Sequence, residues 1–351
     1  MDLLSSMPNA SSLFKKPTLN WGILGTSRIA RNQMIPAIKM VKRNVVAAVG
    51  SRDLTRGREY AQALEIPKAY GSYEELLADP NIQAVYIPLP NNDHAPLAIK
   101  AMQAGKHVLV EKPFALTASE AQLMVSAALE NSVVLMEALM YRMDPRIGRL
   151  IEMVREGELG KLRFISSTFT FSMNNPDDYR LKPELGGGAL YDVGCYCINF
   201  QRLLVGREPL SAQAVCHLGQ SGVDLQVSAT LDFGDQVFTH FDVAYNTTYN
   251  QKTQIIGTEG VLEIERPFNP DKNGSPVWLT KDAETKKINA KGGNNYARLV
   301  EHFYNVAISK DLPIFPLSDA VNNMVVIDAI FQSLADGGAT VAIKAKSNPS
   351  N

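Results

Sequence analysis

A short apolar run that ends in a glycine turn is the first segment whose residue types could do chemistry. The run Trp21-Gly-Ile-Leu-Gly25 leads through Thr26 into an apolar-periodic stretch in which Ala30 is a small residue. Strand, tight turn and helix in this order are the context of a dinucleotide fingerprint, with Gly25 making the turn. The backbone N–H groups of Ser27, Arg28 and Ile29 would then face a pyrophosphate. Ser27 replaces the middle glycine of the fingerprint, and the alternative is that Gly25 only turns the chain.

The end of the second apolar run bears on which dinucleotide would fit. An NAD-preferring site usually offers an Asp or Glu to the ribose 2′-hydroxyl about 20 residues or more past the turn. Ser51 and Arg52 stand there instead, and a hydroxyl beside a planar guanidinium suits a 2′-phosphate. We therefore expect NADP(H) as cofactor. The alternative is that Arg52 is a solvated turn residue and that Asp53 binds the ribose.

The elements that would position these residues follow an alternating pattern. Short apolar runs alternate with longer amphipathic stretches up to about residue 140, which predicts a parallel sheet with helices on both faces. We expect strands at 21–25, 45–51, 84–89, 107–110 and 133–137, and helices at 29–41, 56–64, 95–104 and 118–130.

Beyond about residue 145 the pattern changes to neighbouring strands with little helix between them. Several of these runs alternate apolar with polar residues, which is typical of an antiparallel sheet with one covered and one open face. The open face could bind a second subunit. Helical patterns return at 296–308 and 319–334. The strands are expected at 163–171, 226–233, 236–245, 252–256 and 260–265.

Composition narrows the class of protein. The chain has 351 residues, 45% of them hydrophobic, enough for two globular domains, and 35 Lys+Arg against 36 Asp+Glu. Without a basic field, neither nucleic acid nor a membrane is an expected partner. Cys195, Cys197 and Cys216 fit reduced thiols better than a disulfide framework or a zinc site, so we expect no metal. The opening residues do not resemble a secretory signal; a cytoplasmic protein is expected, with 1–19 as a flexible arm or, alternatively, a docking arm.

Several motifs resemble the Gfo/Idh/MocA oxidoreductases. The first is the stretch 84–96, followed by 104–113, which contains the family hallmark Glu111-Lys-Pro113. The second is Gly186-Gly-Gly-Ala-Leu-Tyr-Asp-Val-Gly-Cys-Tyr196, similar to the family's Asp-x-Gly-x-Tyr element. Further similarities lie at 138–145, 157–160 and 256–263. Together they cover about residues 20 to 340 and look most like the NADP-dependent branch of glucose-fructose oxidoreductase, xylose dehydrogenase and dihydrodiol dehydrogenase.

The resemblance implies an α/β architecture of two domains. The first is a Rossmann dinucleotide-binding domain at 20–140, and the second is an α/β domain at 141–345 with an open, largely antiparallel sheet. The helix at 319–335 could pack back on the first domain. Members of the family commonly associate through this sheet, so a homodimer or homotetramer is expected.

Hydride transfer to or from a carbinol carbon also needs a group that handles the hydroxyl proton. Tyr196 can do this, and a nearby ammonium from Lys112 would favour its phenolate and hold the substrate oxygen. Asp192, four residues before Tyr196, would share its helical face and could orient Lys112 or a sugar hydroxyl. The alternatives are a core aromatic at Tyr196, a helix cap at Asp192 and a surface lysine at Lys112.

The remaining site residues are expected from their positions in the motifs. His94 is expected to contact the cofactor, and the alternative is that it makes a structural hydrogen bond. Asp144 stands where members of the family frequently have His. The substrate is expected to meet Arg142, Asp144, Tyr179, Asp192 and Tyr196. The cofactor is expected to meet Gly25, Thr26, Ser27, Arg28, Ile29, Ser51, Arg52, Pro88, Leu89, Pro90, Asn91, His94, Glu111 and Lys112.

These expectations combine into one function with two alternatives. The first is an NADP(H)-dependent oxidoreductase that acts on a sugar, ketosugar or small diol, with Tyr196 as general acid and base assisted by Lys112. The second is an enzyme that retains its nucleotide and passes hydride between two sugars. The third is a non-catalytic NADP-binding sensor, which would have no need of a proton relay.

Overall fold

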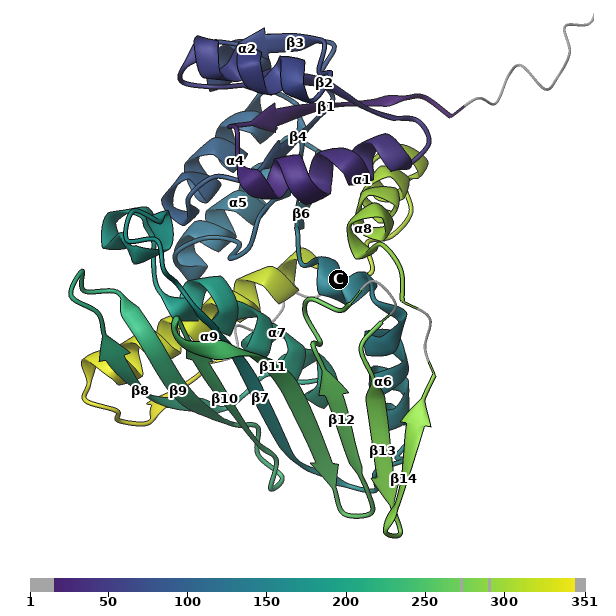
Figure 1. Cartoon of the computed structure of the whole chain (residues 1–351), viewed down its shortest axis with the longest axis vertical. Helices are drawn as coiled ribbons and strands as arrows, with labels where there is room; N and C mark the ends of the chain where they lie inside the picture. The colour runs from purple at the N-terminus through teal and green to yellow at the C-terminus, as the bar shows by residue number, and fades with distance from the viewer. Residues whose placement is uncertain (1–15, 272–273, 290–291, 345–351) are drawn as a thin grey trace, which may run out of the picture.

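The computed structural model describes residues 16–271, 274–289 and 292–344, so the expected arm at 1–19 lies mostly outside the described residues. A six-stranded parallel sheet forms the N-terminal part, in the order β3-β2-β1-β4-β5-β6 (Figure 1). This confirms the predicted Rossmann sheet. The chain reverses its direction of strand addition between β1 and β4, where such sheets open a crevice for ligands.

The bounds of the N-terminal elements agree with the predicted alternation, and β3 and α3 are additional. They are β1 (Leu19–Leu24), a π-helical turn (Ala30–Met34), α1 (Ile35–Met40), β2 (Asn44–Gly50), α2 (Leu54–Ala63), β3 (Lys68–Tyr70), α3 (Tyr73–Ala78), β4 (Ala84–Ile87), a 3-10 turn (Asn91–Asp93), α4 (His94–Gln103), β5 (His107–Val110), α5 (Ala118–Glu130) and β6 (Leu135–Glu137).

The apolar composition of the central strands explains why they lie in the middle of the sheet. All four residues of β4, Ala84 to Ile87, are buried. A continuous apolar run of this kind belongs in a parallel sheet that is covered on both faces. Side chains cap the helices around the sheet: Asp53 accepts the backbone N–H of Arg56 at the start of α2, and Thr117 accepts that of Glu120 at the start of α5.

A nine-stranded sheet forms the second part, in the order β14-β13-β12-β11-β7-β10-β9-β8-β15. The strands β7 and β10 pair in parallel and the other neighbours pair antiparallel. This confirms the largely antiparallel sheet. Its elements are a 3-10 turn (Met140–Met143), α6 (Pro145–Arg155), β7 (Leu162–Ser172), 3-10 turns (Tyr179–Leu181 and Pro183–Leu185), a π-helical turn (Leu190–Gly194), α7 (Cys195–Val205), β8 (Ser211–Leu218), β9 (Asp224–Asp232), β10 (Phe238–Ala244), β11 (Asn246–Gly257), β12 (Val261–Glu265), β13 (Val277–Lys281), β14 (Glu284–Ile288), α8 (Asn295–Tyr304), a π-helical turn (Asn305–Ser309), α9 (Leu317–Ala335) and β15 (Val341–Ala342).

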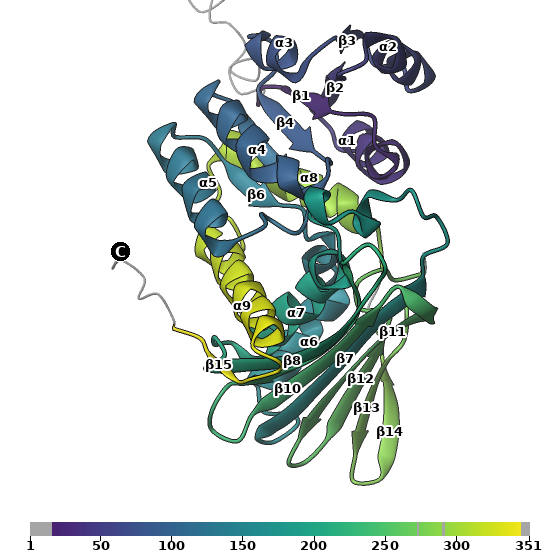
Figure 2. The same ribbon diagram turned by 90° about the vertical axis from the view of Figure 1, so that its left-hand side faces the viewer.

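The two faces of this sheet differ. Helices α6, α7 and α9 cover one face, and no helix of the described ranges covers the other (Figure 2). On β7, Ile165 and Phe169 are buried toward the helices, whereas Phe164 on the opposite face is 51% exposed. The period-two alternation of the strand sequences therefore corresponds to a covered and an open face.

The last two long helices join the two parts. In α8, Phe303 packs on Trp21 of β1 with ring centroids 4.8 Å apart. In α9, the Asp328 carboxylate accepts the backbone N–H of Ala118 at the start of α5. Within the described ranges, no helix is both long enough and apolar enough to cross a membrane.

Candidate active site

The loop after β1 forms one wall of an open cavity of about 580 Å³. Gly25 adopts a φ of +91°, and a Cβ at this position would lie 2.6 Å from Leu89 Cδ2. Only glycine fits this turn without strain. The side chain of Ser27 accepts the backbone N–H of Ala30, which fixes the start of the following helical turn. The cavity lies at the crevice between β1 and β4, where open parallel sheets bind nucleotides.

Arginine side chains gather around this cavity. Arg28, Arg52 and Arg56 line it, together with the acid Asp53. Asp53 is committed to the N-cap of α2, where its Oδ1 accepts the backbone N–H of Arg56. The excess of guanidinium groups over carboxylates gives the cavity a positive balance that matches phosphates. Ten of the expected cofactor residues line it: Gly25, Thr26, Ser27, Arg28, Ile29, Ser51, Arg52, Pro88, Leu89 and Pro90.

A second cavity of about 400 Å³ continues from the first. Both are lined by Ile29, Pro88, Leu89, Tyr179 and Arg180, so they form one cleft between the two parts of the protein. The expected residues Glu111, Lys112, Asp192 and Tyr196 line the second cavity with Tyr179. Residues 80 or more positions apart in the sequence are thus brought together beside the nucleotide crevice.

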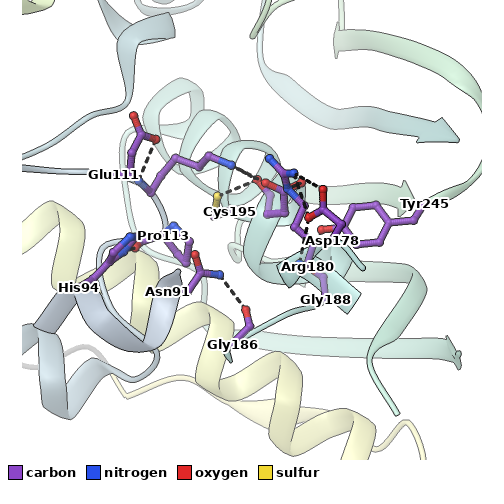
Figure 3. A network of polar contacts seen from close by, with 12 residues as sticks. Asn91, His94, Glu111, Pro113, Asp178, Arg180, Gly186, Gly188, Cys195 and Tyr245 are labelled. Atoms are coloured by element: carbon purple, nitrogen blue, oxygen red, sulfur yellow. Dashed lines mark hydrogen bonds and ion pairs between the residues drawn. The ribbon is translucent and has the colours of Figure 1, made fainter. Parts of the chain in front are cut away.

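Lys112 and Asp192 both line this second cavity. Figure 3 shows the network of polar contacts in this region, with Glu111, Asp178 and Arg180 among its labelled members. The Lys112 ammonium donates to Asp192 Oδ1 at 2.6 Å and to the Asp192 backbone oxygen at 2.7 Å. The other oxygen, Oδ2, lies 2.9 Å from Arg180 Nε. Burial lowers the pKa of Lys112, but the attraction of Asp192 together with smaller contributions from Cys195 and Tyr179 outweighs burial, and the net pKa is raised. Burial likewise raises the pKa of Asp192, but the two cations hold it well below its usual range. Lysine and aspartate are therefore both charged.

Tyr196 lies next to this ion pair in an aromatic wall. The Lys112 Nζ atom is 5.1 Å from the centre of the Tyr196 ring, and Phe169 and Phe268 pack on the same ring. Tyr196 is 7% exposed and lines the cavity. Burial is the main cause that raises the pKa of Tyr196 well above its usual value. The phenol is therefore neutral in this structure, and the stabilisation of a phenolate by Lys112 stays a prediction.

A glycine turn aims the helix that carries Asp192 and Tyr196. Gly188 has a φ of +121°, and a Cβ there would lie 2.0 Å from Asp224 Oδ1. Asp224 Oδ2 accepts the backbone N–H of Leu190 at 2.7 Å, and the Tyr245 hydroxyl donates to the Gly188 carbonyl. The turn thus brings Asp224 against the helix start, with Asp192 and Tyr196 following on its cavity side.

Four expected site residues lie outside both cavities. Asn91 is buried and donates to the Gly186 carbonyl at 2.7 Å, which ties the two domains together. His94 is buried, with its ring nitrogens 2.8 and 2.9 Å from the carbonyl oxygens of Pro113 and Leu89. A neutral ring can donate to one of these two carbonyls. His94 lines neither cavity, which corrects the expectation of a cofactor contact and matches the structural alternative for this residue.

The expected substrate residues Arg142 and Asp144 are also placed elsewhere. Arg142 forms an ion pair with Asp319. Asp144 is 2% exposed, pairs with Arg146 at 2.8 Å and caps α6. Helix capping and a buried ion pair occupy the Asp144 carboxylate, so neither residue reaches the cleft in this structure.

Arg180 is the main cleft residue that the sequence did not reveal. Besides Asp192, it contacts Asp178, which lies 3.6 Å from Arg28 across the cleft. Arg180 lies in a segment of short turns between β7 and α7, where no periodicity marks a position. Its place directly after the expected Tyr179 was the available signal. The other unexpected lining residues of the second cavity are Phe169, Phe171, Val193, Tyr249, Asn269 and Tyr296.

Comparison with known proteins agrees with this geometry. Residues 19–139 match the oxidoreductase family with an NAD-binding Rossmann fold, and residues 147–263 match the GFO/IDH/MocA C-terminal domain. An NADP(+)-dependent D-xylose 1-dehydrogenase of Haloferax volcanii is 35% identical over 91% of this chain and 98% of its own length. A trans-1,2-dihydrobenzene-1,2-diol dehydrogenase of Xenopus laevis is 30% identical over 90% of this chain and 97% of its own. The 3-ketoreductase KijD10 of Actinomadura kijaniata, solved with NADP and TDP-benzene, superposes with a TM-score of 0.86 at 26% identity, covering 90% of this chain and 98% of its own. The chain therefore belongs to the GFO/IDH/MocA family of oxidoreductases.

Proposed function

We propose that this protein is an NADP(H)-dependent oxidoreductase that interconverts a hydroxyl and a carbonyl group on a sugar, ketosugar or small diol. The observation that carries the proposal is the Lys112–Asp192 ion pair beside Tyr196, at the point where the nucleotide crevice meets the second cavity. Two relatives, at 35% and 30% identity, are named D-xylose 1-dehydrogenase (NADP(+)) and trans-1,2-dihydrobenzene-1,2-diol dehydrogenase, which supports a substrate with hydroxyl groups.

The residues around the first cavity fit a dinucleotide phosphate. Gly25 leaves room for the pyrophosphate to approach the backbone, since any larger residue would meet Leu89. Arg28 lines the cavity beside this turn, and Arg52 and Arg56 lie beyond the end of β2, where the 2′-phosphate would be placed. Asp53 is engaged as a helix cap, which favours the phosphate over the ribose hydroxyl as the group recognised there.

The chain's own residues supply proton handling and orientation. When bound, the nicotinamide supplies or accepts the hydride. Because its pKa is raised, the Tyr196 phenol is neutral and can donate its proton to a carbonyl oxygen as the carbon gains the hydride. The Lys112 ammonium donates two of its N–H bonds to Asp192. Its third N–H bond can donate to the substrate's carbonyl oxygen and stabilise the negative charge that develops there. In the oxidation direction the Tyr196 phenol must first release its proton to solvent, and the phenolate then accepts the hydroxyl proton as the hydride leaves the carbon.

Substitution of the two proton-handling residues tests the proposal. We expect Tyr196→Phe and Lys112→Ala each to lower kcat by about 10² to 10⁴, the usual contribution of general acid–base catalysis. Binding of NADPH, followed by fluorescence, should remain within about threefold of the native protein because the first cavity is unchanged. Aldoses, ketoses and diols would be screened by absorbance of the nicotinamide. Unchanged turnover in either variant would remove that residue from the mechanism.

A further inference from the structure

A third cavity, of about 250 Å³, lies apart from the cleft. It is enclosed by β6, the 3-10 turn that follows it, α8, the segment 313–317 and the start of α9. It shares no lining residue with the two cavities of the cleft. An apolar cavity of about 150 Å³ is large enough to bind benzene. The cavity therefore has room for one six-membered ring with a substituent.

Most of the cavity wall is apolar. Leu135, Leu139, Leu299 and Val306 supply aliphatic surface, and Phe315 supplies an aromatic ring. Water gains little in such surroundings, because it finds few hydrogen-bond partners. The wall thus favours the apolar body of a small molecule.

One end of the cavity is polar. Arg142 and Glu137 line this end, with Asp319 beside them. The Arg142 side chain is 6% exposed, its Nη1 pairs with Asp319, and its guanidinium lies 3.1 Å from the centre of the Phe315 ring. Its buried Nε–H has no hydrogen-bond partner among the described residues. An unpaired buried donor is costly, and an acceptor oxygen placed in the cavity could engage the guanidinium that lines it.

The charges at this end point to an uncharged ligand. Asp319 already balances Arg142, and Asp319 also lies 3.2 Å from Arg202. Burial and the neighbouring Asp319 raise the pKa of Glu137 to about 8, so this carboxyl is neutral near pH 7. A neutral carboxyl can both donate and accept a hydrogen bond. A carbonyl or hydroxyl oxygen therefore matches the site, whereas an ion would lack a countercharge.

We propose that this cavity is a second small-molecule site, separate from the nucleotide cleft, for a compact uncharged molecule with an apolar body and one carbonyl or hydroxyl oxygen that accepts from the Arg142 guanidinium. None of its lining residues takes part in the proposed oxidoreduction.

Benzamide is a suitable probe, because a reduced nicotinamide does not reduce its amide carbonyl. Toluene is the matched compound, since it has the same ring but no hydrogen-bond acceptor. Each would be titrated by calorimetry into the chain saturated with NADPH. We expect benzamide to bind with a dissociation constant of about 1 mM or below. In Arg142→Met the benzamide constant should rise about tenfold, while that of toluene stays within about twofold. Asp319 keeps Arg202 and Asn199 in this variant, which preserves the local packing.

Arg149→Met is the matched control, since Arg149 is 41% exposed on α6 and outside the cavity, and both constants should be unchanged. A crystal structure with benzamide should show the ring between Leu299 and Val306 and the oxygen at Arg142. Three outcomes would each overturn the proposal. The first is no saturable binding at a benzamide concentration of about 10 times the expected dissociation constant. The others are benzamide density only in the cleft, and an equal loss of affinity for benzamide and toluene in Arg142→Met.

Discussion

At the scale of single residues, the ionisation of the cleft is set by burial as much as by neighbouring charge. Lys112 and Asp192 keep their charges because each is within hydrogen-bond distance of the other. For Tyr196, burial is the largest cause of a raised pKa, and nearby groups such as Glu111 and Asp192 raise it further. A sequence reveals that a lysine and a tyrosine can meet. The spacing also predicts that Asp192, four residues before the tyrosine, could orient Lys112, and the two side chains form an ion pair in the structure.

Cofactor choice is a prediction about one guanidinium. Arg52→Ala should raise the Kd for NADPH by about 10- to 100-fold, since a charge-assisted contact to phosphate contributes about 1.5–3 kcal/mol. The Kd for NADH, which lacks the 2′-phosphate, should change by less than about threefold. Arg58→Ala on α2 is the control, because Arg58 is exposed and does not line the cavity. Equal losses for both nucleotides would mean that Arg52 does not bind the 2′-phosphate.

Glu137 predicts how stability depends on pH. Its pKa in the folded chain is raised to about 8 from 4.5, so its contribution to stability is present in full below about pH 4.5 and is lost as the pH rises through 8. Between pH 6 and pH 9 this loss amounts to about 3 kcal/mol. Glu137→Gln, which mimics the neutral acid, should remove it. Thermal unfolding of both proteins at the two pH values measures the difference, and parallel losses would show that Glu137 is already ionised at pH 6.

At the scale of elements, the sequence predicted what periodicity can encode. The runs that became β1, β2, β4, β5 and β6 are short and apolar with helices between them, so both their type and their parallel pairing followed. The strands β3, β8, β13, β14 and β15 were missed. Four of the five residues of β14 are exposed, so its sequence carries almost no apolar signal. The central place of β7 beside β10 depends on pairing across about 70 residues, which a local pattern does not contain.

The candidate site was predictable in the same measure. Lys112, Asp192 and Tyr196 belong to motifs with fixed spacing, and the structure brings them together. Arg142 and Asp144 were expected from their place in a loop, but the partners Asp319 and Arg146 hold them elsewhere. These partners are 177 and 2 residues away. Arg146 is close in the sequence, but the sequence does not show that its ion pair with Asp144 is buried away from the cleft.

The turn before α7 allows a test of how an element positions the site. Gly188→Ala should destabilise the chain by about 3 kcal/mol, because alanine is strained at a φ of +121° and its Cβ would collide with the Asp224 carboxylate. Displacement of Asp192 and Tyr196 should also lower kcat in the fraction that folds. Gly148→Ala is the control: Gly148 lies in α6 with open space around its Cβ position, so it should gain about 0.5–1 kcal/mol. Chemical unfolding measures both, and an unchanged Gly188→Ala midpoint would contradict the role of this turn.

At the scale of the whole molecule, the open face of the nine-stranded sheet is the surface that a second copy of the chain would cover. Phe164 and Phe238 are register partners on the neighbouring strands β7 and β10, and they are 51% and 42% exposed. Two exposed phenylalanines side by side on a central strand pair form an apolar patch, and such patches mark protein–protein contacts. His240 and Asp242 continue the same face along β10 and would contribute a polar surround.

We therefore expect the native chain, with a mass of 38.5 kDa, to be a dimer or tetramer in light scattering at micromolar concentration. Phe164→Glu would place a carboxylate in the buried centre of the contact, and an unpaired charge there costs several kcal/mol, so the variant should be a monomer. Its NADPH binding should be kept, because Phe164 is remote from the nucleotide cavity. Leu129→Glu is the control, since Leu129 is 71% exposed on α5, far from the sheet in the fold, and should leave the mass unchanged. A native monomer at these concentrations, or a Phe164→Glu protein with the native mass, would show that the sheet face is not the contact between subunits.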